Sequence, residues 1–411
     1  MNRRVAVTGL GAITPLGLNV QTTWDAILRC ESGIREIESM DTSAFSVHIG
    51  GEVRGFDPKT VVAGKDVNKI DRFALLALAA ADEAVADAGI TADTYGATRT
   101  GVVIGSGVGG LKTVEDNLKS YFEKGPRRIS PFVVPKMMCN AASGQVSIKH
   151  GFKGPNFAVV TACASANHSI GEGYRLIKAG FADAIVAGGS EAAITVLGLG
   201  GFCSAKALSK HAGNPAEACR PFSQSRDGFV LAEGSGVIVL EDLEKAKARG
   251  AKIYGVLDGY GASGDAYHIT APSEDGAGGA MAMKEALAEA GWNPGEVDYI
   301  NAHGTSTPRG DLVETLVIKS VFGHEAKNVA ISSTKSCTGH TLGAAGGIEA
   351  VLSLKALQAG VIPATINSND PDETCDLDYT PNTPREQKLN KVLSNSLGFG
   401  GHNSVLAFSA L

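Results

Sequence analysis

The sequence predicts an α/β protein made of two comparable halves, and two observations carry this prediction. Short apolar runs with β-branched residues alternate with longer helical patterns along all 411 residues, which is typical of strands and helices packed in layers. A second series opens at Ile253, and its run Tyr-Gly-Val-Leu-Asp-Gly-Tyr-Gly loosely echoes Val-Ala-Val-Thr-Gly-Leu-Gly from Val5. We therefore expect one half at residues 1–250 and the other at residues 251–411.

The individual elements follow from apolar periodicity. A strand at residues 5–8 ends at a Gly-Leu-Gly turn, and a helix at residues 71–88 is so rich in alanine that we expect it to be buried between layers. The remaining expected helices are 22–28, 131–149, 241–249, 277–290, 315–322 and 338–359. The remaining expected strands are 101–104, 182–187, 238–240, 297–301 and 330–332, and two more bracket a glycine-rich turn at 395–403.

Composition excludes several classes of protein. Hydrophobic residues make up 44% and charged residues 19% of the chain, which is typical of globular proteins. The net charge of -6 argues against general nucleic-acid binding, and without a run of about 18 apolar residues we expect no membrane span. The chain enters a strand pattern at once, so we expect no signal peptide. The 7 cysteines lack metal-type spacing, which favours free thiols in a reducing, cytoplasmic location.

The stretch from Gly154 to Gly171 carries the first candidate site. Residues 157–161 are apolar and β-branched, which predicts a buried strand, and a helix follows as far as Gly180. Cys163 falls where the strand turns into the helix. Because the first-turn N–H groups and the helix dipole favour an anion, we expect a lowered thiol pKa and a nucleophilic thiolate. The alternative is that Cys163 is one more small buried residue, as free cysteines commonly are.

Three polar stretches follow other expected strands. The first contains His303 in Asn-Ala-His-Gly-Thr-Ser-Thr-Pro, the second contains Lys335 and His340, and the third is the glycine-rich turn around Phe399. Each histidine alone is more often structural than catalytic. Because all three stretches follow strands of an α/β pattern, we expect one shared pocket at the carboxyl edge of the sheets.

Other known patterns fit less well. Residues 105–110 match the dinucleotide-binding pattern G-x-G-x-x-G, but the acidic residue expected after the next strand is missing. Pairing Cys163 with His303 in the manner of papain lacks the Cys-Gly-Ser-Cys-Trp context. His211 and Cys219 have no second ligand pair, so zinc is not supported.

Together, four motifs resemble those of the β-ketoacyl-acyl-carrier-protein synthases, specifically the type II elongating enzymes. They are Thr-Ala-Cys163-Ala-Ser, Asn-Ala-His303-Gly-Thr-Ser-Thr-Pro, Lys335-Ser-Cys-Thr-Gly-His340 and Gly-Phe399-Gly-Gly. The similarity extends from Val5 to Phe408. It implies a thiolase-like fold, a five-layer αβαβα sandwich built from two similar halves and assembled as a homodimer.

The resemblance also implies a decarboxylative Claisen condensation that needs no cofactor. Cys163 would take an acyl chain from acyl-carrier protein as a thioester, and malonyl-carrier protein would lose CO2 and attack it, giving a 3-oxoacyl product. His303 and His340 would donate hydrogen bonds to the malonyl thioester oxygen. The amides of Cys163 and Phe399 would form the oxyanion hole, with the Phe399 side chain as a gate. Lys335, paired with Glu349, would either organise the histidines or serve only as a buried ion-pair member.

Substrate positions follow from the same resemblance. Substrate-binding residues would be Thr305 and Thr307 on the phosphopantetheine arm, Thr270, and Val108, Phe202 and Val133 (the last from the partner subunit) along the acyl chain. Carrier-protein docking would use Lys65, Lys69, Arg127, Arg128 and Lys206, because the carrier is acidic. No metal is required, although some relatives hold a structural cation near Asn301, Glu349, Asn395 and Ser396.

One residue departs from the family pattern, and two related functions stay open. Arg309 is larger and more basic than the small or aliphatic residue expected after Thr-Pro, near the expected pantetheine channel. The chain could instead serve a polyketide or specialised fatty-acid pathway with the same chemistry. It could also be a non-catalytic chain-length partner subunit, but that predicts loss of the nucleophile, and Cys163 is present.

Overall fold

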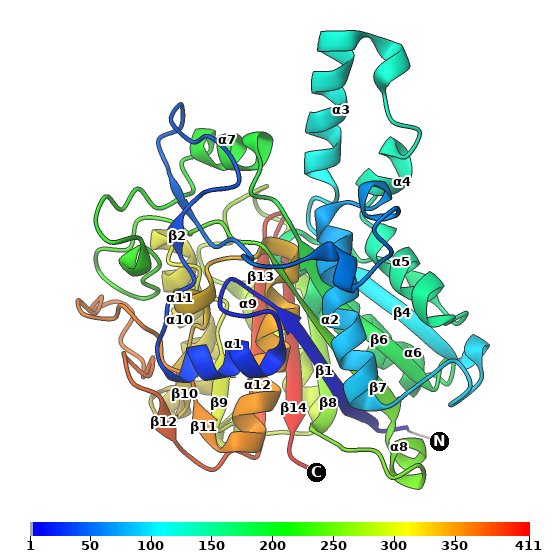
Figure 1. Cartoon of the computed structure of the whole chain (residues 1–411). Helices are drawn as coiled ribbons and strands as arrows, with labels where there is room; N and C mark the ends of the chain where they lie inside the picture. The colour runs from blue at the N-terminus through cyan, green and yellow to red at the C-terminus, as the bar shows by residue number, and fades with distance from the viewer. Residues whose placement is uncertain (1–2) are drawn as a thin grey trace.

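Helices and strands alternate in the structure, a computed structural model that describes residues 3–411 (Figure 1). The main sheet contains β1 (Val5–Ile13), β4 (Thr100–Gly105), β5 (Asn156–Phe157), β6 (Ala184–Glu191), β7 (Gly234–Asp242), β8 (Gly255–Gly264), β9 (Tyr299–Asn301), β10 (Ala330–Ser332), β13 (Lys391–Gly398) and β14 (His402–Ser409). The α-helices are α1 (Val20–Leu28), α2 (Arg72–Ala88), α3 (Leu111–Lys124), α4 (Val133–Met137), α5 (Ala141–His150), α6 (Ser165–Lys178), α7 (Val196–Ser204), α8 (Leu243–Ala248), α9 (Ala277–Ala290), α10 (Pro308–Phe322), α11 (Lys335–Thr338) and α12 (Ala345–Ala359). Two small sheets pair β2 (Arg35–Glu36) with β3 (Ile49–Gly50) and β11 (Val361–Ile362) with β12 (Arg385–Glu386).

The main sheet has the same topology in its two halves. The order β1-β7-β6-β4-β5 on one side matches β8-β14-β13-β9-β10 on the other, and each pair of matching neighbours runs in the same relative sense. The two sets meet through a short antiparallel pairing of β1 with β8. The expectation of two similar halves is therefore confirmed.

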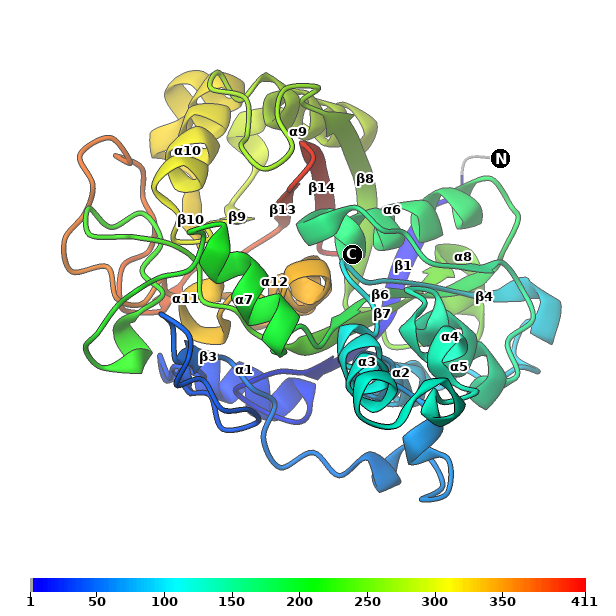
Figure 2. The ribbon, with the colours of Figure 1, turned by 90° about the horizontal axis from the view of Figure 1, so that it is seen from above.

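The layers follow from which helices contact which strands. The helices α6 and α12 contact each other and lie between the two sets of strands, whereas α2 and α5 cover one outer face and α9 and α10 the other (Figures 1 and 2). Nearly every residue of α12 is buried, as expected of a helix apolar on all sides in a middle layer. The five-layer αβαβα sandwich is confirmed.

The echo between the two halves has a packing reason. A Cβ at Gly11 of β1 would lie 1.8 Å from the carbonyl oxygen of Ala80 in α2, and one at Gly261 of β8 would lie 1.8 Å from that of Ala282 in α9. Glycine is therefore needed where each outer helix lies directly on its strand. The sequence echo marks these two equivalent contacts.

Several predicted elements differ from the observed ones. The expected buried strand at 157–161 is wrong: β5 ends at Phe157, and Phe157 is 38% exposed because β5 is the edge strand of the sheet. The helix expected at 131–149 is broken between α4 and α5, and the one expected at 338–359 begins only at Ala345, after a turn. Periodicity alone does not separate a turn of small residues from a helix.

No helix in residues 3–411 is both long and apolar enough to cross a membrane.

Candidate active site

The two middle helices begin at the same place, and the candidate site lies there. Cys163 sits in a single turn, Ala162–Ala164, that leads into α6. The equivalent turn, Leu342–Ala344, leads into α12 and packs against the first. His340 lies two residues before this second turn, so each half of the chain brings a reactive side chain to the contact between the helix starts.

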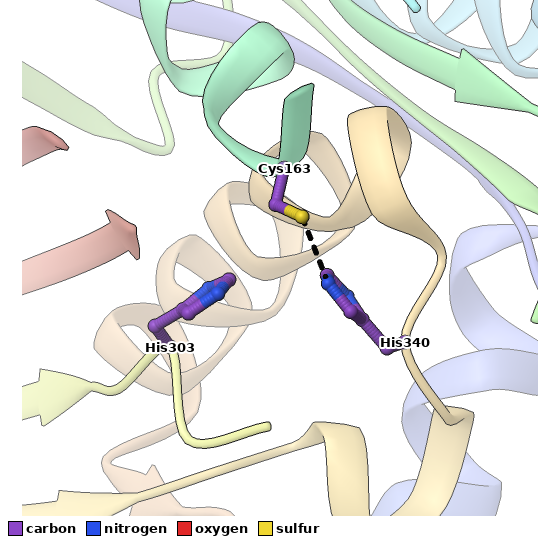
Figure 3. Close-up of side chains that lie close together, drawn as sticks. All are labelled: Cys163, His303 and His340. Carbon is purple, nitrogen blue, oxygen red and sulfur yellow. Dashed lines mark hydrogen bonds between the residues drawn. The ribbon is translucent and has the colours of Figure 1, made fainter. Parts of the chain in front are cut away.

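The sulfur of Cys163 meets two imidazoles from the other half of the chain. Its Sγ lies 3.1 Å from Nε2 of His340, and one ligand-type atom from each of Cys163, His303 and His340 lies within 4.8 Å of the others (Figure 3). The two rings are 5.4 Å apart, centroid to centroid, at 85°. All three side chains are buried. The structure thus brings these three predicted residues into one site.

The expected lowering of the thiol pKa is wrong. Burial raises the pKa of Cys163 to about 11, outweighing the Phe399 amide, the Lys335 charge and the Cys163 amide, which act in the opposite direction. The helix α6 begins only at Ser165, two residues beyond the thiol, so its start does not overcome the loss of water. At neutral pH the free site holds a thiol, and Nε2 of His340 is the base within hydrogen-bonding reach.

This pKa predicts how fast Cys163 reacts with iodoacetamide. Because the thiolate is the reactive form, the alkylation rate should rise about tenfold per pH unit between pH 7 and pH 10. Peptide mass spectrometry over a pH series, with Cys163→Ala confirming the assignment of the modified peptide, measures this rate. A rate that levels off below pH 8 would contradict the raised pKa.

Both histidines are neutral at the site. Burial lowers the pKa of His303 and of His340 well below the ordinary value, and the charge of Lys335 acts in the same direction. Among residues 3–411 the Nδ1 atoms of both rings are buried without a hydrogen-bond partner. A neutral imidazole carries one N–H, so each ring can donate one hydrogen bond to an oxygen bound between them.

Lys335 lies behind the pocket and does not line it. Its ammonium pairs with the Glu349 carboxylate, and both side chains are buried. Burial raises the pKa of Glu349 to about 7 although the ammonium acts against it. The pairing expected from the sequence is therefore present. Lys335 acts on the thiol and the imidazoles through its charge, without touching the cavity.

Two buried carboxylates escaped the sequence analysis. Glu314 accepts hydrogen bonds from the amides of His303, at 2.8 Å, and Gly304, at 2.7 Å, and so fixes the His303 loop. Glu191 accepts from the amides of Gly107, at 2.7 Å, and Gly343, at 3.0 Å. The only signal in the sequence was an acidic residue inside an apolar run, at Glu191 as the last residue of β6 and at Glu314 in α10.

The bonds of Glu191 also argue against dinucleotide binding at the glycine-rich pattern of residues 105–110. Its carboxylate holds the Ser106 hydroxyl at 2.7 Å, the Gly107 amide at 2.7 Å and the Val108 amide at 3.3 Å. These donors are the ones a pyrophosphate would need. They are occupied from within the protein, and the loop instead places Val108 against the cavity.

A cavity of about 380 Å³ surrounds Cys163 and opens to solvent. Its lining includes the sequence-predicted residues Cys163, His303, His340, Phe399, Thr305, Thr307, Thr270, Val108 and Phe202. The hydroxyls of Thr305 and Thr307 lie 3.0 Å apart on one wall. Val133 is on α4 and does not line the cavity of this chain, so its expected place in the partner's pocket stays a prediction.

Glycine at position 398 lets the Phe399 turn approach the nucleophile. A Cβ there would lie 2.7 Å from the Thr161 carbonyl oxygen and 3.2 Å from the Cys163 amide nitrogen. Three residues next to site residues also have left-handed backbones: Ala162 (φ 50°), Ser306 (φ 66°) and Leu342 (φ 47°). Such strain gathers at functional sites, where the surrounding structure holds it.

The five predicted docking cations are all exposed: Lys65, Lys69, Arg127, Arg128 and Lys206. Lys206 lies between Ala205 and Ala207, which line the cavity, whereas Lys69 pairs with Asp66 at 2.7 Å. Their role in carrier docking stays a prediction.

The predicted cation ligands offer suitable atoms. Within residues 3–411, each of the four has one buried oxygen without a hydrogen-bond partner: Asn301, Glu349, Asn395 and Ser396. Hard monovalent and divalent cations prefer such oxygen ligands, so the four residues fit a structural cation. Asn395 also donates to Glu314 at 3.1 Å, which places these residues directly behind the His303 loop.

Comparison with protein families supplies the identification. Residues 2–246 match the beta-ketoacyl synthase N-terminal domain, and residues 254–369 match its C-terminal domain. The chain belongs to the β-ketoacyl synthase family. The 3-oxoacyl-[acyl-carrier-protein] synthase 2 of Staphylococcus aureus (strain COL) is 49% identical over 407 residues, which cover 99% of this chain and 98% of that protein. The enzyme of the same name from Synechocystis is 49% identical over 406 residues, with the same coverage.

Solved ketosynthase structures share the fold over the whole chain. A type II polyketide synthase ketosynthase bound to a hexaketide, in complex with its acyl-carrier protein, has a TM-score of 0.94 at 34% identity and full coverage of both chains. A β-ketoacyl synthase from Burkholderia phymatum has a TM-score of 0.92 at 32% identity, again with full coverage of both. The resemblance seen in the four sequence motifs is confirmed.

Proposed function

We propose that this β-ketoacyl synthase is a 3-oxoacyl-acyl-carrier-protein synthase that elongates acyl chains by decarboxylative Claisen condensation. The observation that carries the proposal is the meeting of the Cys163 sulfur with His303 and His340 inside one cavity. The family and the 49% identity to two enzymes of this name support the same reaction.

The first half-reaction loads the enzyme. Nε2 of His340, 3.1 Å from the sulfur, takes the thiol proton as Cys163 attacks the acyl-carrier thioester. The C–S bond to the carrier breaks, and the carrier thiolate takes the proton back from His340. The amides of Cys163 and Phe399, which both face the sulfur, stabilise the oxyanion of the tetrahedral intermediate.

The second half-reaction joins two carbons. The malonyl thioester loses CO2, and the electron pair moves onto its thioester oxygen as an enolate. The enolate accepts hydrogen bonds from both neutral histidines, with His340 now in the tautomer that carries its N–H on Nε2. The enolate carbon then attacks the Cys163 thioester. Collapse of the second tetrahedral intermediate breaks the bond to sulfur, and the thiolate takes up a proton from solvent. The product is a 3-oxoacyl-carrier thioester two carbons longer.

A polyketide pathway is the second candidate, because the ketosynthase with a TM-score of 0.94 carries a hexaketide. The identity to that ketosynthase is 34%, against 49% to the 3-oxoacyl-carrier-protein synthases, which favours fatty-acid elongation. A non-catalytic chain-length subunit is disfavoured, since the nucleophile and both histidines are present and assembled.

We include a homodimer and a cytoplasmic location in the proposal. The edge strand β5 has a free side, and apolar side chains stand exposed on it, on the segment that follows it and on α3, α4 and α5: Phe122, Val134, Ile148, Phe157 and Val160. A second copy that covers this face would bring Val133 close to it. All seven cysteines are free thiols, in agreement with a reducing compartment.

The dimer is tested by a charge at its expected centre. Ile148 on α5 is 76% exposed, so Ile148→Glu should leave the fold intact while burying a carboxylate in the interface, shifting the protein towards monomer. Sedimentation velocity measures this shift. Met281→Glu, a comparably exposed position on α9 at the opposite outer layer, is the matched control and should stay dimeric. If Ile148→Glu sediments as a dimer like the wild type, the interface lies elsewhere.

The proposed reaction is tested by loading the enzyme with acyl-carrier proteins of varied chain length and locating the acyl group by peptide mass spectrometry. We expect it on Cys163, followed by a 3-oxoacyl product once malonyl-carrier protein is added. An acyl group on another cysteine would overturn the mechanism. Accumulation of polyketide-length products would favour the second candidate.

A further inference from the structure

The mouth of the active-site cavity is bridged by an ion pair. One wall is the loop between β8 and α9, which contributes Thr270, and the facing wall is the start of α10. Nη2 of Arg309 on α10 lies 3.1 Å from Oε1 of Glu274 on the loop. Among the described residues that line the cavity, Arg309 is the one arginine or lysine. It is therefore the permanent positive charge on the way to Cys163.

This ion pair is built to exchange partners. The side chains are 57% and 70% exposed, and such pairs contribute little because water and salt screen them. Each of these two side chains has the other as its only hydrogen-bonding side-chain partner within residues 3–411. A stronger anion arriving at the mouth can therefore take the guanidinium from Glu274 without disrupting the fold.

The surroundings of Arg309 favour an anion. Thr307 occupies the N-cap position of α10 and Pro308 is in its first turn, so Arg309 adds its charge to the positive end of a helix of 15 residues. Asp311 lies on the lining and in the same first turn of α10, but its Oδ2 accepts the Phe222 amide at 2.9 Å and lies 3.7 Å from the Arg226 guanidinium. Its Oδ2 is thus already engaged by the protein, whereas Oδ1 is buried without a hydrogen-bond partner in residues 3–411.

We propose that Arg309 releases Glu274 and binds the phosphate of the phosphopantetheine arm, making it a specificity-determining residue for phosphorylated thioesters. The inference rests on the proposed function. The arm carries its thioester at one end and its phosphate at the other. Cys163, Thr305, Thr307 and Arg309 line one cavity, so an arm with its thioester at Cys163 and its chain along the two threonines would bring its phosphate towards Arg309. A guanidinium can form paired hydrogen bonds to two phosphate oxygens. The single hydrogen bond that Arg309 makes to Glu274 should not prevent this binding.

Two substrates that differ only in the phosphate test this. Enzyme already acylated on Cys163 is given malonyl-phosphopantetheine or malonyl-pantetheine, and KM is measured for each. We expect the wild type to prefer malonyl-phosphopantetheine. Arg309→Ala should raise KM for malonyl-phosphopantetheine about tenfold and change KM for malonyl-pantetheine much less. Glu274→Gln, which frees the guanidinium, should lower KM for the phosphorylated thioester about twofold to threefold. Both changes in KM, that of Arg309→Ala and that of Glu274→Gln, should become smaller in high salt.

The controls separate this proposal from the reaction itself. Lys327→Ala removes an exposed cation that does not line the cavity, and it should keep the wild-type preference. An unchanged preference in Arg309→Ala, with condensation intact, would overturn the role of Arg309 alone. Equal losses with both thioesters would do the same, since they indicate a distorted mouth. Wild-type enzyme that is acylated but condenses neither thioester would overturn the proposed function as well.

Discussion

Cys163→Ala should abolish acyl transfer and condensation, with kcat falling at least about 10³-fold. The reason is that the alanine removes the sulfur that contacts His340 and the Phe399 amide, so no acyl-enzyme can form there. The two histidines remain in place. Slow decarboxylation of malonyl-carrier protein to acetyl-carrier protein should therefore persist, because that step needs only the hydrogen bonds to the enolate.

Mass spectrometry of protein and carrier measures both activities in one reaction. The matched control is Cys203→Ala, which removes a half-buried cysteine of α7 that does not line the cavity. It should elongate acyl chains at the wild-type rate. If Cys163→Ala still forms the 3-oxoacyl product at a comparable rate, this cysteine is not the nucleophile, however well placed it is.

The fold was predictable where local sequence and packing agree. The helix expected at 277–290 and the strand expected at 330–332 have these bounds in the structure, because strong apolar patterns end at clear turns. The echo of the two glycine-bearing runs signalled a duplication because both serve the same contact with an outer helix. The prediction of a buried strand at residues 157–161 failed at the edge strand β5. Whether an apolar run is covered depends on the elements beside it and not on its own residues.

The site was predictable as a set of residues but not as an electrostatic environment. Motifs placed Cys163, His303 and His340 at strand ends, and the structure brings them together. The predicted lowering of the Cys163 pKa was wrong because burial, which depends on the whole fold, raises this pKa more than the nearby amides lower it. Glu191 and Glu314 were missed for a related reason. Their partners are backbone amides, which have no signature in a sequence.

His303→Ala and His340→Ala should each lower the rate of condensation about 10²-fold to 10³-fold, because each removes a donor to the enolate. They should differ in the loading step. Nε2 of His340 lies 3.1 Å from the sulfur and takes its proton, so His340→Ala should also slow acylation of Cys163. His303→Ala should not, because the base beside the thiol remains. Single-turnover acylation followed by mass spectrometry, alongside release of CO2 from malonyl-carrier protein, separates the two steps.

The glutamine variants His303→Gln and His340→Gln sharpen this test. Glutamine keeps an N–H donor but is a poor base, so at position 303 it should restore part of the decarboxylation. At position 340 it should restore decarboxylation while acylation stays slow. His324→Ala, whose side chain is 91% exposed, controls for loss of a histidine elsewhere and should have no effect. Because both rings serve one oxygen, the double alanine variant should lose less than the product of the two single effects. Losses that multiply fully would mean that the two imidazoles act on separate atoms, and the shared enolate would have to be abandoned.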